Sequence, residues 1–263
     1  MLQPRSQLLY VLSQHISPKF RCGVRLDRRR VLLPVRRFEQ KPGECALAAV
    51  ACFANYFDPN VVYEDIRKMM PYKERKDGLH TAQIVGLLNR LGFTKTTVVS
   101  SDIESFDFSW NKLDKRSMIR RLKMVASNYQ KDKDTDNANQ CWHMANRLAD
   151  DECDNNLLID YDFHYHAKMY LRLGTPVITS IEWTKLFRYK KSGSGRRSDV
   201  SGHVECHSFV LRGYNDRDVF VADSHIQYYV DDLIKYRKGY YPVRWTDFCS
   251  CAVDLILVQS PRR

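Results

Sequence analysis

The chain has 263 residues, of which 44% are hydrophobic and 12% aromatic, enough apolar material for the core of a globular protein. A formal net charge of +11 would favour nucleic acid or an anionic membrane as partner if the cations were spread over the main body. Residues 1–37 instead hold nine Lys or Arg against one acid, a balance of +8, so the remainder carries only +3. This distribution argues against nucleic-acid binding by the main domain.

The basic segment 1–37 is predicted to be an N-terminal arm or a targeting segment. Its early apolar run, Leu8–Leu12, is too short for a signal-peptide core, and no stretch approaches the roughly 20 apolar residues of a membrane span. We expect a soluble, cytoplasmic protein without a membrane span. An organelle transit segment or export as an effector is the alternative, and an edge strand at Val31–Val35 also fits the composition.

The first elements after this arm are predicted to be helical. Ala46–Tyr56 is apolar on nearly every face, which indicates a helix buried at the centre of a domain. Helical spacing of apolar residues predicts further helices at Val61–Met70 and Thr81–Leu91, and Gly92 suits the position just past the end of the second. Residues 94–100 are short and β-branched, which predicts a strand.

Residues 102–156 are strongly charged and are expected to form a solvated insertion. Helical patches at Ser117–Tyr129 and Gln140–Leu148 flank the sequence KDKDTDNAN, whose composition is typical of a loop.

The last third of the chain is predicted to supply most strands. A helix at Tyr165–Leu173 ends at Gly174, and KKSGSGRRSDVSGH has the composition of a flexible loop. The strand candidates are Pro176–Ile181, Ser208–Arg212, Val219–Ala222 and Ala252–Gln259. Helices first and strands later indicate an α+β fold with a largely antiparallel sheet, formed by a domain at 38–258 and followed by a tail at 259–263.

The eight cysteines include no CxxC pair, so we expect reduced thiols rather than a disulfide framework. The run His203-Val-Glu-Cys206-His207 contains ligand-type residues, but the paired spacing of a tetrahedral zinc site is missing. No metal or other cofactor is predicted.

Cys45 stands at the start of the predicted buried helix. The positive end of the helix dipole and its unpaired N–H groups would stabilise a thiolate there and lower the pKa of the thiol. Pro42-Gly43 can form a tight turn in front of it, and the amide of Gln40 could donate to a developing oxyanion. The alternative is a small buried residue, as Cys52 is expected to be.

The segment ECHSFVLRGYNDRDVFVADSH predicts a β-hairpin that turns through residues 214–217. A centre near residue 215 would set His207 directly opposite Asp223, where a carboxylate could fix the tautomer of the imidazole. None of the other histidines is so well opposed by a carboxylate. Together with Cys45, these residues suggest a nucleophile, a base and an orienting carboxylate.

At these positions the chain resembles the papain-like cysteine peptidases that process bacteriocin leaders of the double-glycine type, including their free-standing members. The matching motifs are Gln40, Glu44-Cys45-Ala46-Leu47, His207-Ser-Phe-Val-Leu-Arg-Gly213-Tyr214 and Val219-Phe-Val-Ala-Asp223-Ser224. The resemblance implies a papain-like α+β fold in which Cys45 is the nucleophile, His207 the base, Asp223 its orienting group and Gln40 the oxyanion donor.

The chain departs from the family pattern at Ala46, where glycine is usual, and at Ser224, where proline is usual. We expect a cysteine-dependent hydrolase, a peptidase that acts on a peptide or protein through an acyl-enzyme. A deamidase, an acyltransferase and a catalytically inactive protein-binding domain of the same fold are the alternatives. The substrate and the oligomeric state cannot be derived from the sequence.

Overall fold

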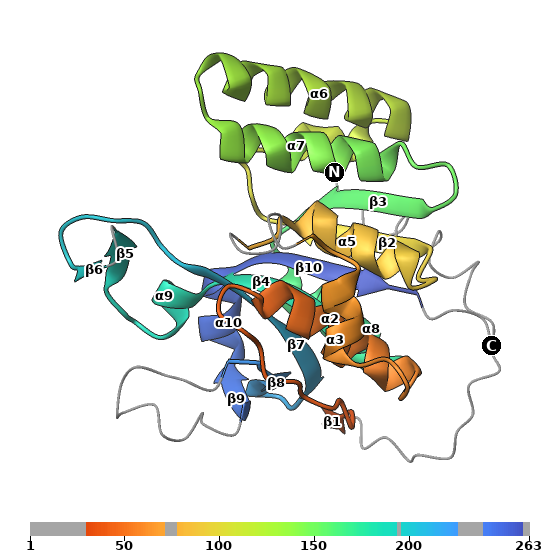
Figure 1. Cartoon of the computed structure of the whole chain (residues 1–263), viewed down its shortest axis with the longest axis vertical. Coiled ribbons are helices and arrows are strands. Elements are labelled where there is room, and N and C mark those ends of the chain that lie inside the picture. The colour runs from red at the N-terminus through yellow and green to blue at the C-terminus, as the bar shows by residue number, and fades with distance from the viewer. Residues whose placement is uncertain (1–29, 72–77, 194–195, 226–238, 260–263) are drawn as a thin grey trace, which may run out of the picture.

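A computed structural model describes residues 30–71, 78–193, 196–225 and 239–259 (Figure 1). Its centre is an eight-stranded sheet in the order β3-β2-β10-β4-β7-β8-β9, with β1 paired to β7. The strands are β1 (Val31–Leu32), β2 (Lys95–Ser100), β3 (Asp154–Ile159), β4 (Val177–Glu182), β7 (Cys206–Tyr214), β8 (Asp218–Ala222), β9 (Tyr240–Arg244) and β10 (Ala252–Val258). β2 and β3 run parallel and the other pairs of this sheet antiparallel, so the expected α+β fold with a mostly antiparallel sheet is confirmed.

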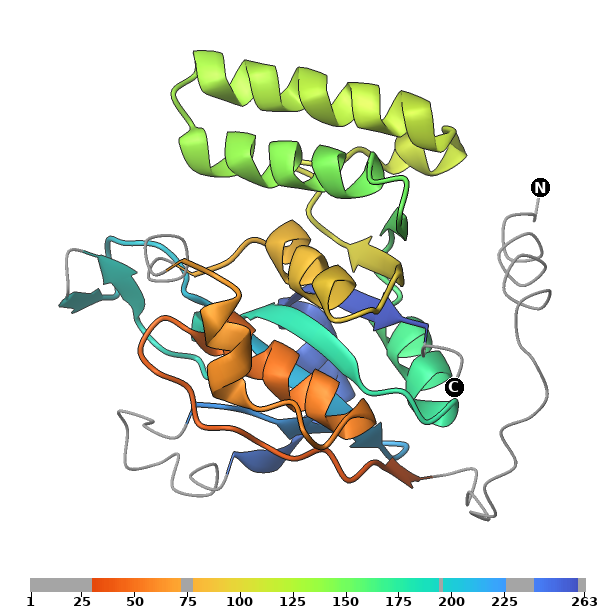
Figure 2. The ribbon, with the colours of Figure 1, turned by 45° about the vertical axis from the view of Figure 1, so that its right-hand side comes forward.

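Helices cover both faces of the sheet (Figures 1 and 2). They are α2 (Cys45–Phe57), α3 (Tyr63–Lys68), α5 (Thr81–Arg90), α8 (Phe163–Arg172), α9 (Trp183–Leu186) and α10 (Trp245–Cys251). α2 and α5 pack on one face, and α8 and α10 on the other. The predicted helices are therefore present, with small differences at their ends.

Helix α2 is the buried helix that the sequence predicts. Every residue from Ala46 to Asn55 is buried, because apolar side chains occur all round the helix. Asn55 is the polar exception, and its side-chain amide donates to the carbonyl oxygens of Pro59 (3.0 Å) and Val61 (2.8 Å). The amide thus satisfies carbonyl groups just past the C-terminal end of the helix. The N-terminal end, with Cys45, is only partly buried.

The charged insertion forms a helical hairpin of α6 (Lys115–Lys131) and α7 (Thr135–Leu148), preceded by the 3-10 helix η1 (Phe108–Lys112). It lies beyond the β3 edge, with α7 packed against α5 (Figure 1). The prediction of a loop across KDKDTDNAN was wrong, since α7 already begins at Thr135. The carboxylate of Asp134 accepts the backbone N–H of Asn137, so a residue typical of loops here caps a helix.

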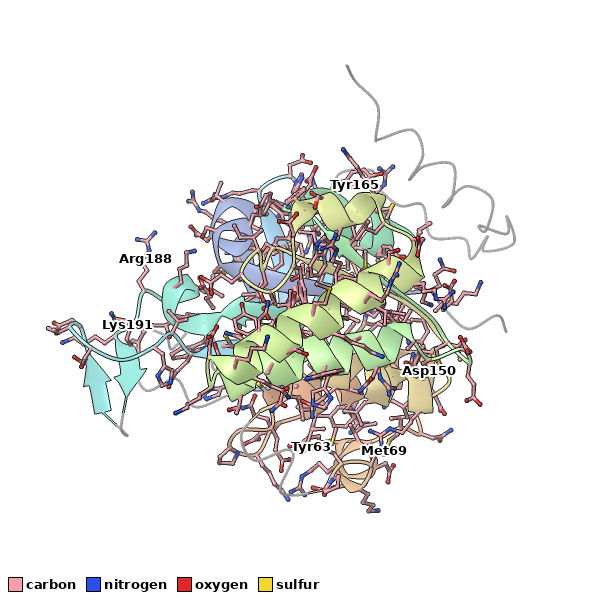
Figure 3. All side chains as sticks on the ribbon, turned by 90° about the horizontal axis from the view of Figure 1, so that it is seen from above. Tyr63, Met69, Asp150, Tyr165, Arg188 and Lys191 are labelled. Carbon is pink, nitrogen blue, oxygen red and sulfur yellow. The ribbon has the colours of Figure 1, made fainter. Side chains whose placement is uncertain are left out.

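The stretch KKSGSGRRSDVSGH was also predicted wrongly as loop throughout. It contains the short paired strands β5 (Lys191–Gly193) and β6 (Arg196–Ser198), which project from the body of the molecule beyond Arg188 (Figure 3). Strands β3 and β9 were missed as well. The turn-prone run Lys76-Asp77-Gly78, expected between the second and third helices, lies outside the described residues except for Gly78.

Residues 1–29 of the basic segment also lie outside the described ranges. The part that is described pairs with β7, where Val31 lies opposite Tyr214 and Leu32 opposite Gly213. Glycine is needed at 213 because a Cβ there would lie 2.2 Å from the carbonyl oxygen of Val31. In the described part of the chain, no helix is both long and apolar enough to cross a membrane.

Candidate active site

Cys45 is the first residue of α2, and the turn that precedes it is the one expected from Pro42-Gly43. Gly43 has a φ of 76°, and the backbone N–H of Glu44 donates to the carbonyl of Lys41 (3.0 Å). The turn brings the chain abruptly into the helix. The thiol is therefore held at the helix end where backbone N–H groups lack intrahelical partners.

His207 and Asp223 are joined by a hydrogen bond of 2.7 Å between Nε2 and Oδ1. His207 lies near the start of β7, and Asp223 follows the last residue of β8. Both side chains are buried. The structure thus brings together the imidazole and the carboxylate that the hairpin argument selected.

The expected register of the β7–β8 hairpin is wrong by two residues at the end that carries His207 and Asp223. Val210 pairs with Ala222, whereas a centre at residue 215 would pair it with Phe220. The register shifts between Leu211 and Gly213, and the turn itself lies between Asn215 and Asp218. A shift of two leaves each side chain on its predicted face, so His207 reaches Asp223 diagonally rather than directly across.

Asp223 is fully buried and accepts two further hydrogen bonds. The hydroxyl of Tyr241 donates to Oδ2 (2.6 Å), and the backbone N–H of His225 donates to Oδ1 (2.9 Å). The backbone N–H of Asp223 donates to the carbonyl of Gly239 (2.7 Å). The two bonds to its oxygens hold the carboxylate in place and favour its ionised form, and the backbone bond fixes the segment that carries it.

Burial raises the pKa of the Cys45 thiol, but the imidazole of His207 and the backbone N–H groups of Ser208 and Ala46 outweigh it and leave the pKa below its ordinary value. Burial also lowers the pKa of His207, and the charge and hydrogen bond of Asp223, together with the nearby thiol of Cys45, reverse this and raise the pKa. Opposite shifts in the two partners favour a thiolate beside an imidazolium.

Cys52 gives the contrast within the same helix. Its side chain is fully buried, and its sulfur accepts the backbone N–H of Phe38 (3.3 Å). Burial raises the pKa of this thiol to about 12. Position in α2, rather than residue type, therefore separates the two thiols.

Gln40 precedes the turn and contacts the residue that follows Asp223. The hydroxyl of Ser224 donates to Oε1 of Gln40 (2.7 Å), and the backbone N–H of Gln40 donates to the carbonyl of Ser224 (3.2 Å). The carbonyl of the side-chain amide is thus engaged, which leaves its NH2 group as the donor for other partners.

Glu44 is a residue that the sequence analysis missed as an anchor of the site. Its buried carboxylate accepts the hydroxyl of Tyr63 (2.6 Å), Nε of Arg67 (2.6 Å) and Nη2 of Arg67 (3.1 Å). The forked contact with the guanidinium fixes the start of α2 to α3. It also balances a negative charge that stands directly before Cys45.

The other histidines that were considered occupy different surroundings. The imidazole of His80 lies 3.5 Å from a carboxylate oxygen of Asp136 and near His143, at the junction of α5 with α7. The ring of His225 lies 5.9 Å from that of His207. Among the described residues, no three His, Cys, Asp or Glu side chains gather as metal ligands would. All seven cysteines in the described ranges are free thiols.

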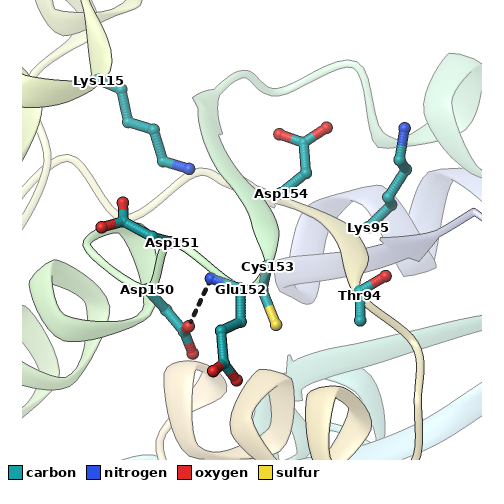
Figure 4. A pocket seen from close by; sticks show the side chains of 8 residues that line it. All are labelled: Thr94, Lys95, Lys115, Asp150, Asp151, Glu152, Cys153 and Asp154. Atoms are coloured by element: carbon teal, nitrogen blue, oxygen red, sulfur yellow. Dashed lines mark hydrogen bonds between the residues drawn. The ribbon is translucent and has the colours of Figure 1, made fainter.

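A separate pocket lies at the beginning of β2 and β3, and strands β2, β10 and β4 separate it from β7 (Figure 4). It is lined by Thr94, Lys95, Lys115, Asp150, Asp151, Glu152, Cys153 and Asp154. Asp150 accepts the backbone N–H of Glu152 (3.2 Å), as expected in a turn between α7 and β3. Acidic turn residues at an open surface give no indication of chemistry.

No family model and no curated protein matches the chain. Among solved structures, it is similar to a protein from Bacillus anthracis that is proposed to be a C39-like peptidase, with 11% identity, a TM-score of 0.40 and coverage of 89% of this chain and 99% of the other. It is also similar to xylellain, a cysteine protease from Xylella fastidiosa, with 13% identity, a TM-score of 0.41 and coverage of 89% and 87%. The expected likeness to cysteine peptidases is thus found in the fold comparison. At these TM-scores it carries no conclusion about activity.

Proposed function

We propose that this chain is a thiol hydrolase that cleaves an amide bond of a peptide or protein. The observation that supports this most strongly is the buried hydrogen bond of 2.7 Å between Asp223 and His207, whose imidazole in turn lowers the pKa of the Cys45 thiol. Cys45 lies at a helix N-terminus, and the residue as a whole is partly exposed, which supports access by a substrate. This is the arrangement that activates a nucleophile at neutral pH.

In the proposed reaction the Cys45 thiolate attacks the carbonyl carbon and forms a C–S bond, and the carbonyl oxygen becomes an oxyanion. The NH2 group of Gln40 and the backbone N–H of Cys45 are the proposed donors to this oxygen. The C–N bond then breaks, and the imidazolium of His207 gives its proton to the departing amine. His207 next takes a proton from water, whose oxygen bonds to the acyl carbon as the C–S bond breaks, so the acyl group leaves as a carboxylic acid and the thiolate is regenerated. Asp223 holds the imidazole in the tautomer that these transfers need.

Competitive alkylation tests the activation of Cys45. A limiting amount of iodoacetamide at pH 7, followed by peptide mapping, should label Cys45 before the exposed Cys206. His207→Gln should slow labelling of Cys45 by at least tenfold and leave Cys206 unchanged. Preferential labelling of Cys206, or equal rates in the two proteins, would contradict the proposal.

Hydrolysis is tested with casein as a general protein substrate and new N-termini as the readout. The wild-type chain should generate them and Cys45→Ala should not. Asp223→Asn should lower the cleavage rate more than it raises KM, because it disturbs the imidazole tautomer rather than the contact with substrate. Cleavage that persists in Cys45→Ala would exclude Cys45 as the nucleophile.

A further inference from the structure

Ser224 is a buried residue next to the carboxylate residue of the proposed triad. It follows Asp223 in the chain and donates to Oε1 of Gln40 over 2.7 Å. A second bond, from the backbone N–H of Gln40 to the carbonyl of Ser224, joins the same two residues. Gln40 is therefore tied by two hydrogen bonds to the residue that follows the triad carboxylate.

The direction of the side-chain bond is what matters chemically. A glutamine amide can present either its carbonyl oxygen or its NH2 group to a neighbour, and rotation about the last side-chain bond exchanges them. Only the NH2 group can stabilise an oxyanion, and a carbonyl in its place would repel one. A hydroxyl that donates to Oε1 favours the orientation in which the carbonyl faces Ser224 and the NH2 group does not.

We infer that Ser224 is a positioning residue that orients the Gln40 amide toward the oxyanion, an inference that rests on the proposed function. The backbone bond between the two residues has a related consequence, since it links the segment before Cys45 to the segment after Asp223. Ser224 thereby couples the proposed oxyanion donor to the residue that carries the triad carboxylate.

Two reagents separate this role from a structural one. Attack of Cys45 on p-nitrophenyl acetate passes through a carbonyl oxyanion, whereas alkylation by iodoacetamide displaces iodide and forms none. Ser224→Ala should slow the burst of p-nitrophenolate about tenfold, a part of the loss expected when an oxyanion donor is removed altogether. The rate of Cys45 alkylation should stay unchanged, which also shows that the thiolate and its imidazole partner remain intact.

Ser101→Ala is the matched control. Ser101 is partly buried at the end of β2, and its hydroxyl donates to the backbone carbonyls of Ala252 and Val253 over 3.3 Å, with β10 and β4 between it and β7. This variant should retain the wild-type burst rate. A double-mutant cycle completes the test, because Ser224→Ala should cause no further loss once Gln40→Ala has removed the amide.

Three outcomes would overturn the role of Ser224 and leave the proposed function standing. They are equal slowing of Ser224→Ala with both reagents, no slowing of its burst, and an undiminished loss of burst rate when Ser224→Ala is added to Gln40→Ala. A wild-type chain in which Cys45 reacts preferentially with neither reagent would overturn the proposed function, and the inference with it.

Discussion

The hydroxyl of Tyr241 donates to one carboxylate oxygen of Asp223 over 2.6 Å while His207 occupies the other over 2.7 Å. Tyr241 lies in β9 opposite Val221, so β9 supplies a support for the site that the β7–β8 hairpin alone does not contain. The carboxylate is inaccessible to solvent, and water cannot easily replace a lost donor.

Tyr241→Phe should therefore reduce the free energy of unfolding by about 2 kcal/mol, the cost of leaving a buried charged acceptor short of one hydrogen bond. The same loss makes ionised Asp223 less favourable and thereby weakens the charge pair of His207 with Cys45. On acidification, the rate of Cys45 alkylation should therefore begin to fall at a higher pH in the variant than in the wild type. Urea denaturation and the pH profile of labelling measure the two effects.

Tyr240→Phe is the control, because the Tyr240 hydroxyl contacts the backbone of Arg37 and Val35 instead. Its side chain is exposed, and water can take over both bonds. A larger loss of stability in Tyr240→Phe than in Tyr241→Phe would show that the bond to Asp223 is not the important one.

The two cysteines of α2 should respond oppositely to the same substitution. Cys45→Ala should abolish labelling and turnover and change the free energy of unfolding by less than about 1 kcal/mol, since the thiol lies at a partly exposed helix end. Cys52→Ala should cost about 1–2 kcal/mol by leaving a small cavity, with the alkylation rate of Cys45 unchanged. Urea denaturation together with labelling distinguishes them, and unfolding of Cys45→Ala would mean that the sulfur serves packing.

The pairing of His207 with Asp223 could be predicted from the sequence because it depends on neighbouring parts of the chain. These are two strands, a short turn and side chains that alternate with period two. Beside the turn the register differs from the expected one by three residues, and the bulge near Arg212 takes back one, so the net shift of two at the site preserves the face. A shift of one would have broken the prediction. The position of Cys45 could be predicted for a similar reason, since an apolar run preceded by Pro-Gly fixes where a helix begins.

The contacts that hold the site residues in place could not be predicted from the sequence in this way. Tyr241 reaches Asp223 only because β9 returns to pair with β8, and the chain between these strands gives no signal of that return. Arg67 reaches Glu44 because α3 packs beside α2 at one angle among several that its sequence would allow. Both contacts depend on tertiary packing rather than on spacing along the chain.

The ion pair of Glu44 with Arg67 yields a prediction for both stability and reactivity. Arg67→Met keeps much of the side-chain volume but leaves a buried carboxylate without its cation, which should cost about 3 kcal/mol. The uncompensated charge adjoins Cys45 and disfavours a thiolate, so alkylation at pH 7 should also slow. Lys68→Met, which removes an exposed cation paired with Asp65 on the same helix, should do neither. Equal behaviour of the two variants would contradict the anchoring role.

Asp254 predicts a distinct dependence of stability on pH. It lies in β10, accepts the hydroxyl of Thr81 at the start of α5, and is buried. Burial raises the pKa of this carboxyl to about 6, and the hydroxyl groups of Ser100 and Thr81 only partly offset the rise. The folded chain thus keeps a proton that the unfolded chain has already lost over this range.

Because the unfolded state binds fewer protons between the ordinary carboxyl pKa of about 4 and the raised value, stability from this group falls as the pH rises through that window. Above the raised pKa the loss is complete and amounts to on the order of 2–3 kcal/mol. Asp254→Asn has no proton to lose and keeps an oxygen that can accept from Thr81. Its free energy of unfolding relative to wild type should therefore rise by that amount between pH 4 and pH 7, as measured by urea denaturation at both values. A difference that stays constant with pH would mean that Asp254 is ionised in the folded protein, and the buried network around Thr81 would then have to stabilise a charge.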